Sequence, residues 1–354
     1  MSQLIPVSKP RHRVLIVGGG SIGERHLRCF LTTGRATVAL CEKKPERVRQ
    51  LAAIYPLTDT FTDFHAVDLA AFDAVVICVY ADLHVPWAQR AIEAGAHVLI
   101  EKPLSNSPEG IAGLAHAAAQ RGRVAAVAHV RRALRSSRLI RAELERGAIG
   151  LPLSLSWTLG YDHRVARTDY RSTYWRDRNL GGGVVLDLSS HASDLVQWLL
   201  GPVRSVVATY DRLQLEDTPC EDTLSYVLRF QRSQAIATLH CNAWQPHRSD
   251  ALVVSGTNGT LTYDGVTGRL GVAERGGAWS WTEGLNGTPD AKGQVDEPFI
   301  VQAADFLDAI EGIAAPLCSL DDGRHTLEIC AAVLASGAQR REVALPLAPL
   351  PQDV

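Results

Sequence analysis

A short apolar run followed by a glycine-rich turn constrains the fold of this chain more than any other feature. Val14-Leu15-Ile16-Val17 has the pattern of a strand buried on both faces. Gly18-Gly19-Gly20-Ser21-Ile22-Gly23 follows and fits G-x-G-x-x-G, and residues 21–33 then have a helical pattern. A strand, a glycine turn and a helix in this order predict the first part of a dinucleotide-binding βαβ unit.

Each glycine of this turn has a separate expected role. Gly18 allows the tight turn, Gly20 lets the backbone approach a pyrophosphate, and Gly23 lets the helix pack on the strand. The free N–H groups at the helix start would face the phosphates, so Ser21 and Ile22 join the predicted cofactor-binding residues.

An acidic residue at the expected distance indicates which dinucleotide binds. Glu42 lies nineteen residues after Gly23, at the end of the next predicted strand, residues 37–40. Its carboxylate would accept hydrogen bonds from the ribose hydroxyls and repel a 2′-phosphate. NAD is therefore predicted in preference to NADP, although Lys43 and Lys44 would partly reverse that preference.

Strands and helices continue to alternate through the first 130 residues, which predicts a parallel sheet covered by helices. The further strands are expected at 73–79, 97–100 and 124–128, and the further helices at 45–54, 85–94 and 108–121. Residues 1–130 are accordingly predicted to form a Rossmann NAD-binding domain.

The second half has a different pattern, in which many strands follow few helices. Helices are expected at 137–146, 184–200, 299–311 and 322–337, and strands at 151–159, 203–212, 222–230, 234–242, 251–256, 259–263 and 268–273. Residues 131–354 are therefore predicted to be an α+β domain with a large, mostly antiparallel sheet.

Composition excludes several classes of function. The 36 basic and 38 acidic residues give a net charge of −2, which offers no electrostatic footprint for nucleic acid or an anionic membrane. No apolar run is long enough to span a bilayer, and the N-terminal ten residues lack the apolar segment of a signal peptide. The seven cysteines form no C-x-x-C pair. A cytoplasmic protein without disulfides or a metal site is expected.

Lys102 lies where open α/β sheets bind ligands. It belongs to Glu101-Lys102-Pro103, just after the predicted strand 97–100, and only five of the 36 basic residues are lysine. A compact ammonium there would stabilise an oxygen that develops charge. An exposed turn lysine without a chemical role is the alternative interpretation.

The second candidate cluster lies on the helix predicted at 184–200. Asp187 and His191 are four residues apart and Asp194 follows a turn later, so the three side chains would share one helical face. A carboxylate beside an imidazole suits general acid–base chemistry. An ordinary ion pair on a helix face and a metal site are the two alternatives.

Taken together, these motifs resemble the glucose–fructose oxidoreductase / inositol dehydrogenase (Gfo/Idh/MocA) family. The resemblance rests on residues 18–23, DAVVICVYADLH at 73–84, AIEAGAHVLIEKPLS at 91–105, YWRDRNLGGGVVLDLSSHASDLVQWLLG at 174–201 and DDGRHTLEICAAVLAS at 321–336. It implies a Rossmann domain followed by an open-faced sheet, through which such chains form homodimers or homotetramers.

The resemblance also implies roles for individual residues. Lys102, Asp187 and His191 match the family's catalytic positions. The positions near the cofactor are His84, Glu101, Trp175 and Arg176, and Arg131 matches an arginine at the entry to the second domain. Val79-Tyr80 replaces the usual Thr-Pro, Arg132 a common Phe and Ser189 a common Gly, so the wall of the cofactor pocket and the pocket shape are expected to differ.

The resulting hypothesis is hydride transfer between a secondary alcohol of a sugar and nicotinamide. His191 would take the hydroxyl proton, Asp187 would hold the imidazole, and Lys102 would stabilise the alkoxide-like oxygen. An NAD-dependent glycoside hydrolase that oxidises its substrate transiently would use the same residues. A non-catalytic NAD-binding regulator is the third alternative.

Arginines and aromatic residues indicate an anionic sugar as the substrate. They gather before the helix at 184–200 and at the turn into the second domain: Arg131, Arg132, Arg135, Tyr161, His163, Arg164, Arg167, Tyr170, Arg171, Tyr174, Trp175, Arg176 and Arg178. Arg131, His163 and Tyr174 are the predicted substrate-binding residues among them. Ion pairs with Asp162, Asp169 and Asp177 are the competing explanation for the arginines.

Overall fold

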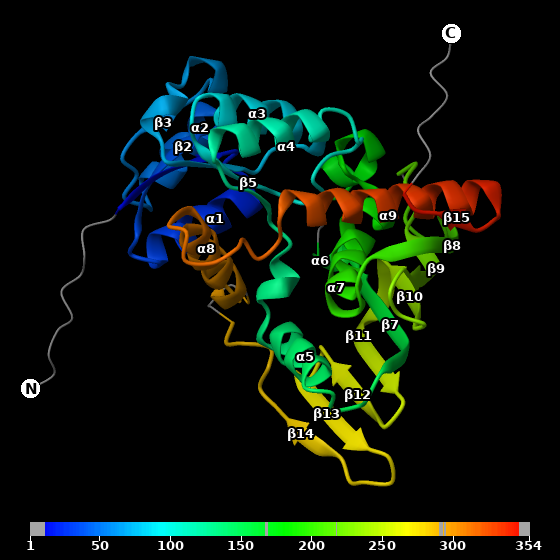
Figure 1. Ribbon diagram of the computed structural model, residues 1–354. Coiled ribbons are helices and arrows are strands. Elements are labelled where there is room, and N and C mark those ends of the chain that lie inside the picture. Colours follow the sequence, from blue (N-terminus) through cyan, green and yellow to red (C-terminus); the bar gives the residue numbers. More distant parts are fainter. Residues whose placement is uncertain (1–10, 167–168, 217, 290–292, 294, 347–354) are drawn as a thin grey trace, which may run out of the picture. The chain divides into compact units, whose positions relative to one another are not determined.

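Six strands in the order β3-β2-β1-β4-β5-β6, all parallel, form the first sheet. The computed structural model describes residues 11–166, 169–216, 218–289, 293 and 295–346 (Figure 1). The strands are β1 His12–Val17, β2 Ala36–Cys41, β3 Thr60–Phe61, β4 Ala74–Ile77, β5 His97–Ile100 and β6 Ala125–Val127. This is the strand order of a dinucleotide-binding fold, and it confirms the predicted Rossmann architecture.

Helices cover both faces of this sheet. They are α1 Ser21–Thr32, α2 Pro45–Ala52, α3 Ala81–Glu93, α4 Ile111–Arg121 and α8 Glu297–Ile310. Figure 1 shows α3 and α4 on one face and α1 and α8 on the other. Val14, Ile16 and Val76 are fully buried, because central parallel strands receive a helix on each side.

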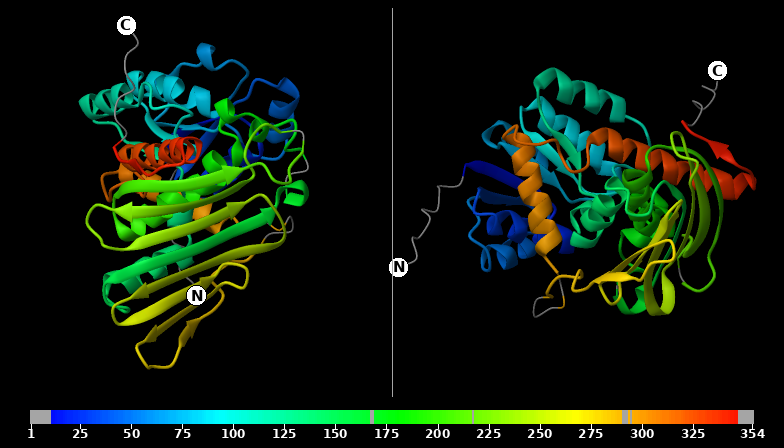
Figure 2. Two further views of the ribbon diagram at one scale, coloured as in Figure 1. Left: turned by 90° about the vertical axis from the view of Figure 1, so that its right-hand side faces the viewer. Right: turned by 60° about the horizontal axis from the view of Figure 1, so that its bottom comes forward.

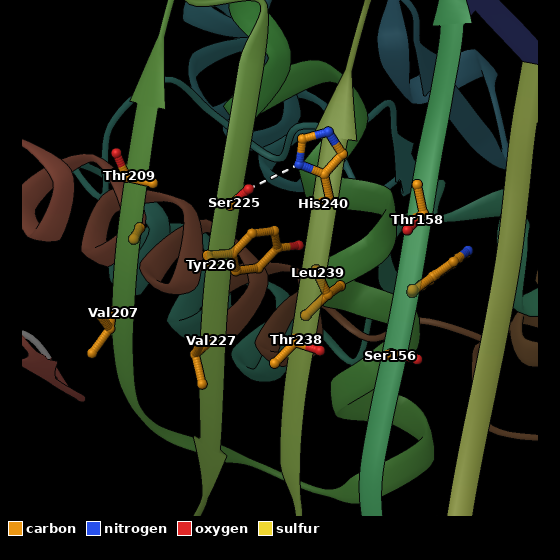
Figure 3. Close-up of a pocket in the computed structure, with 12 residues that line it drawn as sticks. Ser156, Thr158, Val207, Thr209, Ser225, Tyr226, Val227, Thr238, Leu239 and His240 are labelled. Atoms are coloured by element: carbon orange, nitrogen blue, oxygen red, sulfur yellow. Dashed lines mark hydrogen bonds between the residues drawn. The ribbon is translucent and has the colours of Figure 1, made fainter. Parts of the chain in front are cut away.

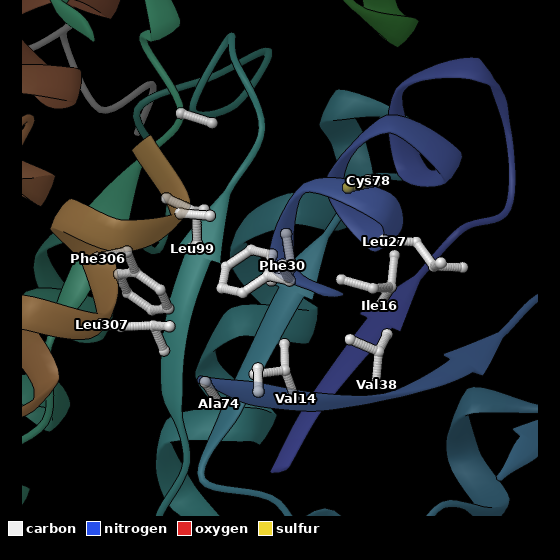
Figure 4. Close-up of a cluster of buried hydrophobic side chains, with 14 of the residues drawn as sticks. Val14, Ile16, Leu27, Phe30, Val38, Ala74, Cys78, Leu99, Phe306 and Leu307 are labelled. Atoms are coloured by element: carbon white, nitrogen blue, oxygen red, sulfur yellow. The ribbon is translucent and has the colours of Figure 1, made fainter. Parts of the chain in front are cut away.

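The chain divides into two compact units, and the first includes a late segment. It comprises the described parts of residues 1–105, 109–133 and 289–323, whereas the second comprises 106–108, 134–288 and the rest of the described chain. This differs from the predicted division at residue 130, which placed α8 in the second domain. Phe306 and Leu307 of α8 lie in the core cluster with Ile16 and Phe30 (Figure 4).

The second unit is built on a nine-stranded sheet in the order β14-β13-β12-β11-β7-β10-β9-β8-β15. Its strands are β7 Pro152–Asp162, β8 Val203–Asp211, β9 Thr223–Phe230, β10 Ile236–Asn242, β11 Trp244–Gly256, β12 Gly259–Asp264, β13 Arg269–Glu274, β14 Ser280–Thr282 and β15 Val343–Ala344. Neighbouring strands are antiparallel except β7 and β10, which are parallel. The predicted mostly antiparallel sheet is confirmed, and Figure 2 shows it face-on.

Helices of the second unit are α5 Arg135–Glu145, α6 His163–Ala166, α7 Ser190–Leu200 and most of α9 Leu320–Gln339. Short 3₁₀ turns occur at Phe64–Ala66, Leu69–Ala71, Val130–Ala133, Tyr174–Arg176 and Arg178–Leu180. The α-helix expected over 184–200 is interrupted, because Val185–Ser189 is π-helical and α7 begins only at Ser190.

Candidate functional site

The glycine turn between β1 and α1 combines two glycines that packing requires with one that borders open space. Gly18 has φ +98°, and a Cβ on it would lie 2.4 Å from the Cys78 carbonyl oxygen. A Cβ on Gly23 would lie 1.8 Å from the Gly18 carbonyl oxygen. Around Gly20, however, a Cβ would meet no described atom within 4 Å. The turn is therefore tightly built on its inner side and accessible at Gly20, as a bound diphosphate requires.

The start of α1 fits an anionic ligand. Gly20 occupies the N-cap position, and in the described chain no side chain caps this helix end. The first N–H groups of a helix have no partner within it, and the helix dipole favours negative charge there. Ser21 and Ile22, predicted to bind the cofactor, form the first turn.

Glu42 is fixed beside the glycine turn by two backbone donors. Its Oε2 accepts a hydrogen bond from Gly19 N at 2.7 Å, and its Oε1 accepts one from Lys44 N at 3.0 Å. Lys43 and Lys44 are exposed. Arg47 of α2, which the sequence analysis did not single out, donates to the Gly19 carbonyl at 2.7 Å. The carboxylate is thus held beside the glycine turn, where the sequence analysis expects it to meet a ribose hydroxyl.

His84 lies inside the protein. It sits on α3 and is 1% exposed. Its Nδ1 is 2.9 Å from the Pro103 carbonyl oxygen, and its Nε2 is 3.1 Å from the Val79 carbonyl oxygen. Burial lowers the pKa of His84. Val79 is half-buried, and Tyr80 is 44% exposed.

Lys102 follows β5 in a turn whose neighbouring residues are buried. Glu101 and Pro103 are buried, whereas Lys102 is partly exposed. Glu101 Oε1 lies 2.8 Å from Nε2 of His26, and Oε2 accepts the Lys102 N–H at 3.0 Å. Burial raises the pKa of Glu101, but the hydrogen bond from His26 and the nearby positive charges outweigh it, so the pKa lies below its usual value.

In the second unit, Asp187 is held by two aromatic donors. The Tyr174 hydroxyl donates to Oδ1 at 3.0 Å, and the Trp175 indole Nε1 donates to Oδ2 at 3.2 Å. Asp187 is 7% exposed and Trp175 is 1% exposed. His163 is fully buried, with its ring centroid 4.6 Å from that of Trp175. Four residues predicted separately from the sequence therefore lie together in this unit.

His191 occupies the first turn of α7, directly after the π-helical segment that contains Asp187. It is partly exposed, whereas Asp194 is fully buried and accepts a hydrogen bond from Thr326 at 3.3 Å. The expected shared face assumed an unbroken α-helix. The π-helical turn changes the angle between residues 187 and 191, and such turns often occur at functional sites.

Several arginines that suggested an anionic substrate already bind carboxylates. Arg164 forms a two-pronged contact with Asp162, at 2.9 and 2.8 Å, and Arg178 contacts Glu221 at 2.6 Å. Arg132, predicted to shape the pocket, is buried 3.2 Å from Asp322 and donates to the Leu317 carbonyl. Arg176 is exposed and Arg131 half-buried, and Arg167 lies outside the described residues.

Comparison with known protein families identifies both halves of the chain. Residues 12–129 match the model of the oxidoreductase family with an NAD-binding Rossmann fold, and residues 137–262 match the GFO/IDH/MocA C-terminal domain. Together the two matches cover more than half of the chain. The first unit is therefore an NAD-binding domain.

Individual relatives include sugar oxidoreductases. A 1,5-anhydro-D-fructose reductase of Ensifer adhaerens is 28% identical over 75% of this chain and 78% of its own. A D-glucoside 3-dehydrogenase of Escherichia coli (strain K12) is 27% identical over 55% of this chain, a match that spans only 56% of that relative.

A levoglucosan dehydrogenase solved in complex with NADH shares the fold. Its TM-score is 0.84 at 22% identity, covering 95% of this chain and 100% of that one. Among the described helices, none is long and apolar enough to cross a membrane. The two matched domains correspond to the two sheets of the structure. The chain belongs to the Gfo/Idh/MocA family of NAD-binding oxidoreductases.

Proposed function

We propose that this protein is an NAD-dependent dehydrogenase or reductase acting on a secondary alcohol of a sugar or sugar derivative. The observation that carries the proposal is the fixation of Asp187 by Tyr174 and Trp175, immediately before the partly exposed His191. A buried carboxylate held by two donors remains in place to orient a base. The sugar oxidoreductases among the relatives support the substrate class.

The side chains divide the chemistry between them. The cofactor supplies a hydride acceptor, or a donor in the reverse direction. In the oxidising direction, His191 takes the proton of the substrate hydroxyl, and Asp187 stabilises the resulting imidazolium. Lys102 balances the negative charge that develops on the same oxygen as the carbinol carbon loses its hydride.

An anionic group on the sugar is the second part of the proposal. It rests on Arg176, which is exposed, and on the prediction from the sequence that Arg131 binds the substrate. Arg132, Arg164 and Arg178 contact acidic residues of the protein itself. Arginine suits carboxylate, sulfonate and phosphate oxygens. A substrate panel tests this part, since neutral polyols that outperform every acidic sugar would overturn it.

Point variants test the catalytic roles. Lys102→Ala and His191→Ala should each lower turnover by about 10² to 10⁴ while NAD still binds. Arg121→Ala and His116→Ala are the controls, because both residues are exposed on α4. Near-normal turnover in both active-site variants would remove the mechanism. Net NADH formation supports a dehydrogenase, whereas glycoside cleavage without net cofactor change would identify the glycosidase instead.

A second copy of the chain is the proposed partner, through the nine-stranded sheet. One sheet face carries a hollow lined by small, hydroxyl, aliphatic and aromatic residues, with His240 hydrogen-bonded to Ser225 (Figure 3). Val207 is 46% exposed there, and no Asp, Glu, Lys or Arg lines the hollow within the described chain. Val207→Asp should shift a dimer or tetramer to a smaller species in light scattering; a wild-type monomer would refute this pairing.

The cytoplasm is the proposed compartment. All seven cysteines are buried as free thiols, which suits a reducing environment. Burial raises the pKa of Cys29 and of Cys41 to about 12, so these thiols are inert at neutral pH.

A further inference from the structure

The turn that carries Lys102 is anchored on both sides by buried histidines. Lys102 is partly exposed, but Glu101 before it and Pro103 after it are buried. Each of these two neighbours contacts one imidazole, His26 in the first case and His84 in the second. A lysine side chain has four rotatable bonds and no rigidity of its own, so its direction depends on the backbone that carries it.

His26 anchors the turn through the Glu101 side chain. It is fully buried on α1, and its Nε2 lies 2.8 Å from Glu101 Oε1. Because a carboxylate only accepts hydrogen bonds, the imidazole proton must be on Nε2. The Nδ1 of His26 has no hydrogen-bond partner in the described chain, so a second proton there would be buried without an acceptor. The hydrogen bond to Glu101 is therefore the contact through which this ring holds the turn.

Glu101 in turn restrains the backbone of Lys102. Its second oxygen, Oε2, accepts the backbone N–H of Lys102 at 3.0 Å. A buried carboxylate that is bonded at both oxygens has little freedom to rotate. His26, Glu101 and the Lys102 backbone thus form one continuous chain of hydrogen bonds.

His84 anchors the other side of the turn through backbone carbonyls. Its Nδ1 faces Pro103 O at 2.9 Å, and its Nε2 faces Val79 O at 3.1 Å. A neutral imidazole donates to one carbonyl at a time, and a charged one would donate to both. The ring therefore lies between the residues that follow β4 and the turn that follows β5, with the shorter contact to Pro103. His26 belongs to α1 and His84 to α3, and these two helices cover opposite faces of the sheet (Figure 1).

We propose that His26 and His84 are positioning residues that fix the direction of Lys102, acting through Glu101 and Pro103. Neither ring contacts the reacting atoms in this proposal. The expected effect of His26 and His84 on turnover rests on the proposed function of Lys102, whereas their effect on the direction of the Lys102 side chain does not. The chain offers a matched control in His97, a buried histidine at the opposite end of β5 whose ring accepts the Val124 N–H.

The lysine content of the chain allows a direct test that needs no substrate. Only five lysines occur, at positions 9, 43, 44, 102 and 292. Reductive methylation of the full protein with ¹³C-formaldehyde gives each its own NMR signal, and Lys102→Arg assigns the one of interest. In His26→Leu and His84→Leu the Lys102 signal should move, whereas His97→Leu should leave it at the wild-type position.

Conservative variants protect the test against misfolding. Glutamine at position 26 or 84 retains an N–H donor, so His26→Gln and His84→Gln should return the Lys102 signal toward its wild-type position. Turnover should fall about 10- to 100-fold in the leucine variants, as expected for a misplaced group, with the NAD dissociation constant little changed.

The outcomes separate this inference from the proposed function. An unchanged Lys102 signal in both leucine variants overturns the positioning role, as does a loss of turnover that is equal in His97→Leu. A shifted signal in a protein whose turnover does not depend on Lys102 supports the positioning role and overturns the proposed mechanism.

Discussion

Trp175 donates its indole N–H to Oδ2 of Asp187, across 3.2 Å in a nearly solvent-free environment. The contact joins a 3₁₀ turn, Tyr174–Arg176, to the π-helical segment Val185–Ser189. Because the second carboxylate oxygen is taken by Tyr174, the position of Asp187 depends on both aromatic donors.

Removing the indole donor should destabilise this cluster. Trp175→Phe keeps a ring against His163 but leaves Oδ2 of Asp187 without its donor, which should cost about 1–3 kcal/mol of unfolding free energy. Urea unfolding of Trp175→Phe, Asp187→Asn and the double variant measures the coupling. Strictly additive losses would show that the two side chains do not interact.

Alanine substitution at two glycines of the same turn should affect different properties, stability at Gly23 and NAD affinity at Gly20. Gly23→Ala places a Cβ 1.8 Å from the Gly18 carbonyl oxygen, so it should lower stability by about 3 kcal/mol or more. Gly20 has φ −66° and a Cβ there meets nothing within 4 Å, so Gly20→Ala should leave stability within about 1 kcal/mol. Its added methyl should instead weaken NAD binding, as measured by calorimetry. Unchanged NAD affinity in Gly20→Ala would contradict the expected approach of the pyrophosphate.

Glu42 should govern the choice between NAD and NADP. Glu42→Ser removes both the acceptor for the ribose hydroxyls and the charge that repels a 2′-phosphate, leaving Lys43 and Lys44 exposed nearby. We expect the ratio of kcat/KM for NAD to that for NADP to fall about 10- to 100-fold, the effect of a charged hydrogen bond. Glu46→Ser, an exposed carboxylate on α2, is the control. An unaltered ratio would assign cofactor choice to other residues.

An ion cluster at the end of α8 should make stability depend on pH. Hydrogen bonds from His12 and Arg35, at 2.8 and 3.0 Å, lower the pKa of Glu311 from 4.5 to about 2. Since the unfolded chain binds this proton more readily, the stabilisation is complete above pH 4.5 and disappears as pH falls toward 2.

Glu311→Gln reports this dependence directly. Its stability deficit should be about 1 kcal/mol near pH 6, given partial exposure, and should shrink as the pH is lowered to 3. Urea unfolding across this range measures it. A deficit that stays constant from pH 6 to pH 3 would assign the loss to packing instead of charge.

Sequence predicted the first sheet well, because buried parallel strands such as Val14–Val17 are continuous apolar runs bounded by glycine. The π-helical turn at Asp187 was not predictable, because the apolar spacing of residues 184–200 does not distinguish an α-helix from a short π-helical segment. Strand β11 begins at Trp244, well before the predicted residue 251, because His247 and Arg248 lie on an exposed stretch without apolar alternation.

Pairing partners distant in sequence were also beyond prediction. Helix α8 has an evident apolar face, but nothing in its pattern shows that Phe306 packs against Phe30 of α1. His26 was missed because a lone histidine in an apolar helix face gives no sign of its partner, Glu101. The aromatic residues Tyr174 and Trp175 were identified by type, whereas their shared contact with Asp187 required the structure.

The late return of α8 to the first unit has a consequence for biosynthesis. When the ribosome has made only the six parallel strands, Phe30 still lacks its contact with Phe306, which lies more than 270 residues downstream. The nucleotide-binding half therefore cannot reach its final stability during the synthesis of its own strands. The nascent chain carries an exposed apolar surface while strands β7 to β14 are translated, and such a surface favours aggregation or binding to chaperones.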